Sequence, residues 1–409
     1  MERVILHSDM NNFFASVELL SHPELAGCPV AVAGDVEKRH GIVLAKNNIA
    51  KGMGVRTGEP LWQAKRKCPK ITFLPPHYEL YEEYSRRAKE IYYEYTDMIE
   101  PFGMDECWLD VSGSVGIFGD GRQIADLIRQ RIRRELGLTV SVGVSFNKVF
   151  AKLGSDIKKP DATTVISREN FKELVWGLPA SDMLFVGPKS SSKLKLYGIK
   201  SIGDLACADP HFLKALLGKN GILLHDFANG HDISPVAIFN EKAAPKSIGN
   251  STTAPRDLVS ADDVNIILYR LCENVSRRLR VGGLVCRTVQ VSVRYCDLRS
   301  CERQIKLDYP NRTAQSIFEA ARSLMSKRRL DSEPIRSLGV RATDIFSLDS
   351  EQLSLSPDIM RIQRTEAVEN VVDGLRARFG DMAVRRGIMF TDIGLSSIAL
   401  SSSGLNLSD

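Results

Sequence analysis

Apolar residues recur along the chain in patterns typical of a mixed α+β protein. A short apolar run at 3–8 (RVILHS) predicts a buried strand, and 106–112 and 139–145 predict two more. Helical spacing places apolar side chains on one side of 78–98 and of 122–136. We therefore expect a compact α+β sheet with its helices on one face.

The pattern changes after this first region. Residues 167–231 contain short helical stretches joined by glycine-centred turns, VGPKS, YGIKSIGD and LGKNG. The segment 232–245 lacks periodicity and contains two prolines, which indicates a linker. Beyond it, a helix at 261–280 and alternating strands at 287–295 and 336–345 predict a second α+β domain. One face of its sheet is apolar and the other is polar to basic.

The C-terminal region is expected to hold one further helix, at about 361–379. The end of the chain, SSIALSSSGLNLSD (396–409), has the composition of a disordered segment. The helix carries apolar residues at helical spacing, namely Val368, Val371, Val372, Leu375 and Phe379.

Composition is that of an ordinary soluble protein. A chain of 409 residues is long enough for two to four domains. No apolar run approaches the roughly 18 residues that a membrane span needs, and the N-terminal VIL is too short for a signal peptide. We expect a cytoplasmic protein. The 8 cysteines form no C-x-x-C pair, which favours reduced thiols over a zinc site or a disulfide framework.

Charge is unevenly distributed. The net charge is +5, and residues 241–350 carry 19 Lys and Arg against 13 Asp and Glu. This excess indicates either an anionic polymer partner or an ordinary solvated face. Charge alone does not decide between them.

Three carboxylates carry the most specific chemistry. Asp9 falls at the end of the first strand, and Asp105 and Glu106 are adjacent in the hairpin stretch GMDECWLD (103–110). If these strands are neighbours, the three acids converge and need cations, and hard divalent ions prefer such oxygen ligands. Two such ions serve in-line phosphoryl displacement. The alternative is a turn acid and a helix-capping acid that share no site.

The neighbouring residues favour a nucleotide site. Phe13 and Phe14 follow Asn11 and Asn12, so a rigid ring close to the acids is placed to wall a sugar pocket. Lys158 and Lys159 precede a proline at the end of a predicted helix, where a lysine can hold a triphosphate. A solvated helix end is the commoner use of such a lysine pair.

Five motifs together give a resemblance to a known family. They are DMNNFFASVE (9–18), GMDECWLD (103–110), SVGVSFNKVFAKLGSDIKKPD (141–161), VGPKSSSKLKLYGIKSIGDL (186–205) and KSIGNSTTAPRDL (246–258). In this order they strongly resemble the Y-family translesion DNA polymerases of the bacterial DNA polymerase IV type. The resemblance runs from residue 1 to about 345.

The resemblance implies a right-hand polymerase, an α+β multidomain fold with a ferredoxin-like palm, small fingers, a helix-hairpin-helix thumb and an α+β little finger. The implied bounds are 1–20 and 78–166 for the palm, 21–77 for the fingers, 167–231 for the thumb, 232–245 for the linker and 246–345 for the little finger. Residues 346–409 form a tail with a clamp-binding-like peptide and a helix.

It also implies an activity: low-fidelity, template-directed translesion synthesis from dNTPs on primer–template DNA, by a monomer without proofreading. Two Mg²⁺ ions per active site are implied, with Mn²⁺ as a substitute. The alternative is a non-catalytic paralogue that binds primer–template DNA and recruits other polymerases. A weaker rival is another palm-type enzyme, such as a nucleotide cyclase. An inactive relative tends to lose one of Asp9, Asp105 or Glu106, and this chain keeps all three.

The family's functional residues carry over by motif. The resemblance makes Asp9 and Asp105 metal-binding carboxylates, Glu106 the third acid and the Met10 carbonyl a backbone ligand. It makes Phe14 the steric gate against ribonucleotides. The remaining predicted contacts are Phe13, Asn48, Lys51 and Lys159 with the nucleotide, Gly187, Lys189, Ser190, Arg294 and Arg341 with DNA, and Gln352, Leu353 and Leu355 with a sliding clamp.

Several positions depart from the family pattern. Ala45, Asn48 and Lys51 stand where the family usually has Ser or Thr, Tyr and Arg, and a lysine does not reproduce a bidentate arginine contact. The further departures are Ile42 and Leu44, which are bulkier than usual over the nascent pair, Phe185 in place of a hairpin glycine, and Ser356 in place of the aromatic of the clamp peptide. We therefore expect weak clamp binding.

Overall fold

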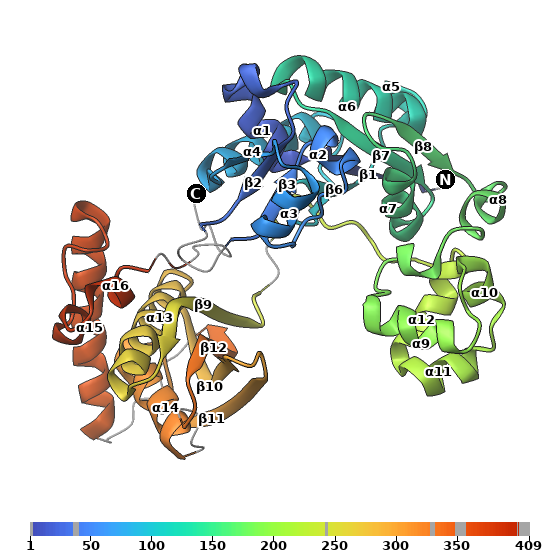
Figure 1. The fold of residues 1–409 in the computed structure, drawn as a ribbon. Coiled ribbons are helices and arrows are strands. Elements are labelled where there is room, and N and C mark those ends of the chain that lie inside the picture. The colour runs from blue at the N-terminus through green and yellow to red at the C-terminus, as the bar shows by residue number, and fades with distance from the viewer. Residues whose placement is uncertain are drawn as a thin grey trace. The chain divides into compact units, whose positions relative to one another are not determined.

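The computed structural model describes residues 3–35, 41–241, 244–327, 332–347, 357–398 and 400. Packing divides the chain into two compact units, each with its own core (Figure 1). Of the described residues, 3–34 and 41–241 form the N-terminal unit, and those from 244 to 400 belong to the C-terminal unit.

A five-stranded sheet of order β5-β6-β1-β7-β8 forms the centre of the N-terminal unit. β1 is antiparallel to both of its neighbours, and β8 runs parallel to β7. All of β1 is buried, because it has a strand on each edge and helices packed against it. The strands span Ile5–Met10 (β1), Ile99–Pro101 (β5), Glu106–Asp110 (β6), Val140–Ser145 (β7) and Thr163–Ile166 (β8).

Helices cover both faces of this sheet, so the expectation of helices on one face is wrong. Leu6 packs in the core formed with α4 and α6, whereas Ile5 packs with Ala151 of α7 on the other face. Gly143 explains the close approach of α7, because a Cβ atom there would lie 1.9 Å from the Ala151 carbonyl oxygen. These helices span Phe13–Ser21 (α1), Tyr78–Tyr93 (α4), Val115–Phe118 (α5), Gly121–Leu136 (α6) and Lys148–Ile157 (α7), with a 3₁₀ turn at Pro23–Leu25 (η1).

The segment between α1 and α4 folds into a small three-stranded sheet of order β3-β2-β4. Its core is thin and consists largely of small side chains, among them Ala31, Val43, Ala50 and Ala64. The elements span Val30–Ala33 (β2), Val43–Lys46 (β3), Asn48–Gly52 (α2), Leu61–Lys67 (α3) and Thr72–Leu74 (β4).

Short helices follow β8. Their core includes Phe146 and Phe150 at the start of α7, which attach this helical segment to the sheet. The helices span Phe171–Val175 (α8), Pro188–Leu196 (α9), Ile202–Cys207 (α10), Pro210–Leu217 (α11) and Lys219–Ala228 (α12), with a 3₁₀ turn at Ala180–Asp182 (η2).

The predicted linker is partly anchored. Val236 is buried, and the Asp232 carboxylate accepts a hydrogen bond of 3.1 Å from the backbone N–H of Lys148. The Arg3 guanidinium also donates to the Ser234 carbonyl oxygen at 2.8 Å. The first part of 232–245 therefore packs along the N-terminal unit, although it forms no helix or strand.

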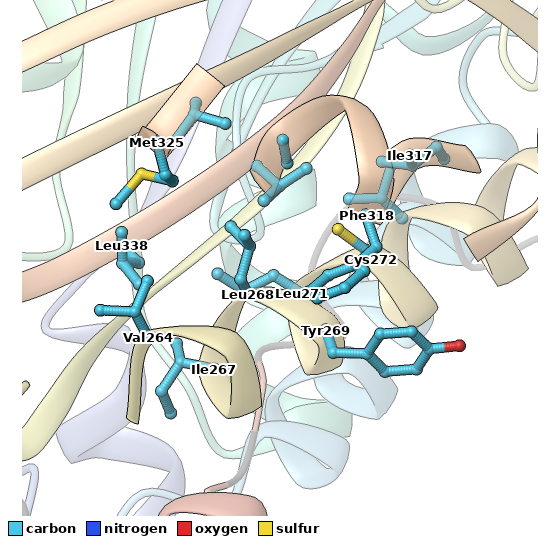
Figure 2. Close-up of a cluster of buried hydrophobic side chains, with 14 of the residues drawn as sticks. Val264, Ile267, Leu268, Tyr269, Leu271, Cys272, Ile317, Phe318, Met325 and Leu338 are labelled. Carbon is cyan, nitrogen blue, oxygen red and sulfur yellow. The ribbon is translucent and has the colours of Figure 1, made fainter. Parts of the chain in front are cut away.

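The C-terminal unit is built on a four-stranded antiparallel sheet of order β11-β10-β12-β9. Figure 2 shows its core, where Leu268 and Leu271 of α13 meet Ile317 of α14 and Leu338 of β12. The elements span Ser247–Leu258 (β9), Ala261–Val281 (α13), Leu284–Tyr295 (β10), Ser300–Asn311 (β11), Ala314–Lys327 (α14) and Ile335–Ser347 (β12).

The C-terminal residues add a further layer to this unit. Helix α15 (Pro357–Phe379) lies beside α13 and α14 on the side away from the sheet (Figure 1). A 3₁₀ turn (η3, Gly387–Phe390) and α16 (Ile393–Ser396) follow it. The expected disorder of 396–409 is wrong at its start, because Ser396 is buried and both Ile398 and Leu400 pack against the core.

Two further expectations concern the clamp peptide and membrane-spanning helices. The predicted clamp peptide residues Gln352, Leu353, Leu355 and Ser356 lie outside the described residues. Within the described ranges, no helix is long and apolar enough to cross a bilayer.

Candidate active site

Strand register brings the three carboxylates to one end of the five-stranded sheet. Asp9 of β1 pairs directly with Glu106 of β6, and Asp105 is the residue before that strand. The backbone N–H of Met10 donates to the Asp105 carbonyl oxygen at 3.0 Å, which extends the pairing past the end of β6. The acids are therefore neighbours because two adjacent strands end together.

Asn11 ties the segment that follows α7 to this end of β1. Its side-chain amide donates to Ser141 Oγ at 2.9 Å, and its Oδ1 accepts the backbone N–H of Asp161 at 2.8 Å. Lys159, two residues before Asp161, places its ammonium 2.7 Å from Asp9 Oδ2. A lysine far away in sequence thus enters the carboxylate cluster.

Lys152 of α7 is a site residue that sequence reasoning missed. Its ammonium lies 2.8 Å from Glu106 Oε2, 3.5 Å from Asp9 Oδ2 and 3.4 Å from Asp156 Oδ2. The signal was present in the sequence, because Lys152 and Asp156 are four residues apart in a predicted helix and lie on one side of it, close to the start of the segment that holds Lys159.

The surroundings of the three acids shift their pKa values in opposite directions. Desolvation raises the pKa of Asp9 to about 6, against the effect of Lys159, and it also raises the pKa of Asp105. Glu106 is partly buried too, but the neighbouring His7 ring and the Lys152 ammonium outweigh desolvation and lower its pKa to about 2. Further positive charge close to Asp9 and Asp105 would favour their ionised forms.

The donor set fits a hard divalent cation. It consists of the carboxylates of Asp9, Asp105 and Glu106, and carboxylate oxygens are ligands that such an ion prefers. Among the described residues, no three His, Cys, Asp or Glu side chains already converge closely enough to hold a metal ion. In this structure Asp9 and Glu106 contact the ammonium groups of Lys152 and Lys159 instead.

A cavity of about 320 Å³ opens beside the acids. Phe14 lines it, and the Phe14 ring stacks on Tyr81 with 4.1 Å between centroids, so its orientation is held by packing. The other lining residues are Asp9, Met10, Asn12, Phe13, Leu44, Ala45, Lys46, Thr57, Asp105, Glu106 and Lys159.

Comparison with known proteins gives this site its context. Residues 8–156 match the impB/mucB/samB family, and residues 245–355 match the C-terminal domain of that family. A DNA polymerase IV of Acetivibrio thermocellus is 52% identical over 97% of this chain and 100% of the relative. The DNA polymerase IV 2 of Bacillus subtilis is 38% identical over 96% of each chain. The chain belongs to the Y-family of translesion DNA polymerases, in the bacterial DNA polymerase IV group.

The fold agrees with this membership. A Y-family DNA polymerase chimera superposes with a TM-score of 0.74 at 24% identity, covering 84% of this chain and 99% of the other. The right-hand α+β architecture expected from the motifs is thereby confirmed. The chain is a DNA-directed DNA polymerase, and nothing in these comparisons supports the non-catalytic alternative. Dependence on a divalent metal follows from membership of the Y-family.

The small sheet contributes residues that differ from the usual Y-family pattern. Ala45 lines the cavity, as do Lys46 and Thr57, and the Lys46 ammonium donates to Thr57 Oγ1 at 2.9 Å. Sequence reasoning missed both Lys46 and Thr57. Asn48 accepts a hydrogen bond of 3.0 Å from Asn12, and Lys51 is exposed on α2. Neither Asn48 nor Lys51 lines the cavity in this structure.

The predicted DNA contacts lie at two separate places. Gly187 precedes α9, with Lys189 and Ser190 in its first turn. Phe185, just before them, has a left-handed φ of 70°, a conformation that favours glycine. In the C-terminal unit, Arg294 and Arg341 are exposed, and Arg341 is paired with Gln290 across β10 and β12. They lie on the sheet face opposite α13 and α14.

Proposed function

We propose that this Y-family polymerase extends primers on damaged templates through a two-Mg²⁺ centre held by Asp9, Asp105 and Glu106, with the Met10 carbonyl as a backbone ligand. The observation that carries the proposal is that these acids and Lys159 line the same cavity as Phe14. When bound, the ions activate the primer 3′-hydroxyl and neutralise the leaving pyrophosphate, and Mn²⁺ can replace Mg²⁺.

The chain's own residues orient the incoming dNTP. Lys159 holds its triphosphate as a point charge, and Lys152 balances the charge of Glu106. Lys46 offers a second cation at the cavity wall. It can contact the triphosphate there, whereas its neighbour Ala45 has no side chain that forms hydrogen bonds. Asn48 and Lys51 reach the nucleotide only if their segment approaches it.

Phe14 with Phe13 forms the wall that excludes a 2′-hydroxyl. Its packing against Tyr81 supports this role, because a ring fixed at 4.1 Å from its neighbour does not move aside at low cost.

The remaining parts bind primer–template DNA. We assign the palm to 1–20 and 78–166, the fingers to 21–77, the thumb to 167–231 and the little finger to 246–345. The start of α9 (Gly187, Lys189, Ser190) contacts a phosphate without reading sequence, and Arg294 and Arg341 contact duplex backbone. We further propose a cytoplasmic monomer that binds a sliding clamp weakly through Gln352, Leu353 and Leu355.

Primer extension with Mg²⁺ on undamaged and abasic templates tests the function. The unmodified chain should extend both primers, and Asp105→Ala should lose extension while still binding primer–template DNA. Arg299→Ala, a variant at an exposed ion pair in the C-terminal unit, is the control and should extend normally. Metal-independent extension, or extension by Asp105→Ala, would refute the two-metal centre.

A further inference from the structure

Helix α15 turns its charged side toward the protein. Glu366, Glu369, Asp373 and Arg376 recur at intervals of three and four residues, so they lie on one side of the helix. Each of them makes an ion pair with α13 or with Arg312, which lies between β11 and α14. A surface helix usually presents its apolar side to the protein instead.

The contacts of this inward side are specific. The Arg280 guanidinium lies 2.5 Å from both Glu369 Oε2 and Asp373 Oδ2, and the Arg280 and Glu369 side chains are only 7% and 9% exposed. Glu369 Oε2 also accepts the backbone N–H of Ala314 at 3.0 Å, at the start of α14. Arg376 is held by Glu273 at 3.0 Å. Rotating the helix would leave several buried charges without partners, which is costly.

The consequence is an exposed apolar stripe on the opposite side. Val368, Val371, Leu375 and Phe379 are 62%, 64%, 40% and 62% exposed. We call these four residues the α15 stripe. Burying such side chains gains roughly 25 cal/mol per Å² of apolar surface, and contiguous exposed apolar patches mark interaction sites.

The charges beside the α15 stripe are basic. Arg364 and Arg378 are exposed, and each is seven residues from Val371, which is about 10 Å along the helix axis. The acids of the same turns face inward and are paired. The outward surface of α15 is therefore apolar and cationic.

We propose that the α15 stripe binds an amphipathic helix of a partner protein whose apolar face is flanked by carboxylates. Helix-to-helix docking of this kind uses anchors at the spacing of the α15 stripe. A second copy of this chain fits poorly, because an antiparallel pairing centred on Val371 sets Arg364 against Arg378 of the other copy. A parallel pairing sets each arginine against itself. Charge complementarity thus selects an acidic partner.

Two synthetic helical peptides test this proposal on the full-length chain. They share one leucine stripe and differ only in flanking residues, glutamate in one and lysine in the other. Fluorescence anisotropy should show binding of the glutamate peptide at least about 10-fold tighter than that of the lysine peptide, and the difference should shrink as salt rises. The double variant Arg364→Glu with Arg378→Glu should reverse the preference.

Apolar variants locate the site. Val371→Asp with Leu375→Asp should abolish binding of the glutamate peptide, whereas Val259→Asp, at a residue 72% exposed and outside α15, should leave it unchanged. All variants should keep wild-type melting temperatures and primer extension. Equal affinity for the two peptides, no binding of either, or no effect of the charge reversal would overturn the proposal. So would a dimer, seen by light scattering, that Val371→Asp dissociates.

Discussion

Two clusters of buried charge differ in how completely their acids are paired. In the N-terminal unit, Asp9, Glu106 and Asp156 share Lys152 and Lys159. Asp105 makes no ion pair with any described residue. In the C-terminal unit, arginines hold the acids, with Arg280 between Glu369 and Asp373 and further pairs at Glu366 and Glu273.

The chemistry of the cations differs as well. Lysine is a flexible point charge that can be exchanged for another cation, whereas the planar fork of arginine fixes carboxylates in one geometry. An excess of acid held by lysines beside a cavity therefore suits a site that takes up metal ions. A cluster closed by arginines suits a fixed joint between helices. The two clusters should respond in opposite ways to mutation.

The largest expected effect is loss of activity without loss of stability. Asp105→Asn should reduce Mg²⁺-dependent primer extension by roughly 10³-fold, because it removes a proposed metal ligand. The melting temperature should stay equal or rise, since burial raises the pKa of Asp105 and so disfavours its charge. Thermal unfolding and single-turnover extension measure the two effects. A destabilised variant that remained active would make this cluster structural.

At Arg280 we expect loss of stability without loss of activity. Arg280→Met should lower the free energy of unfolding of the C-terminal unit by about 3 kcal/mol, because it leaves Glu369 and Asp373 without their shared cation. Denaturant unfolding measures this change, and primer extension well below the melting temperature should be normal. Arg299→Met removes an exposed pair and should cost less than about 1 kcal/mol. Equal losses in the two variants would contradict the distinction.

The cavity beside the first cluster can be tested at Phe14. Phe14→Ala should reduce discrimination between dNTPs and rNTPs by roughly 10- to 100-fold, since the wall against the 2′-hydroxyl is shortened. Steady-state incorporation of matched dNTP and rNTP pairs measures the ratio. Phe102→Ala, at an exposed ring 43% accessible, is the control. Unchanged discrimination in Phe14→Ala would remove Phe14 from this role.

The smallest expected effect is a change in the free energy of unfolding at the ion pair between Arg256 and Asp263, which belongs to neither cluster. The Arg256 guanidinium donates to Asp263 at 2.7 and 2.8 Å, and these hydrogen bonds hold the pKa of Asp263 below its ordinary value. The pair therefore stabilises the fold above the unfolded pKa of about 4, and this contribution is lost as pH falls through the lower folded value.

Asp263→Asn should consequently cost on the order of 1 kcal/mol at pH 7 and progressively less in acid. Melting curves at a series of pH values compare it with the wild type. A difference that stays constant with pH would assign the stabilisation to the hydrogen bonds alone.

Local patterns predicted the secondary structure well. The strand at 139–145 and the helix at 122–136 appear at nearly their predicted bounds, because their periodicity was unambiguous. The side of β7 that receives α7 was not predicted. The close packing of α7 there depends on Gly143. Small residues that alternate with valines are equally typical of a strand face exposed to solvent and of a face that packs against a helix.

In the active site, too, some residues were predicted from the sequence and others were not. Motifs gave Asp9, Asp105, Glu106 and Lys159 as candidates. Tertiary pairing brings them together, because β1 pairs with β6 and Asn11 holds the segment after α7 beside β1. Lys46 was missed because its approach to the cavity depends on how the small sheet folds against α1.

The sequence alone determined the polymerase family, the two α+β regions and the acids at the end of the sheet, because these depend on short-range spacing and on motifs in order. Only the tertiary structure decided which side of α15 faces the protein. Its periodicity predicts burial of Val368, Val371 and Leu375, yet these residues are exposed. The reason is that Arg280 and Arg312, far away in sequence, bind the acids on the other side of the helix.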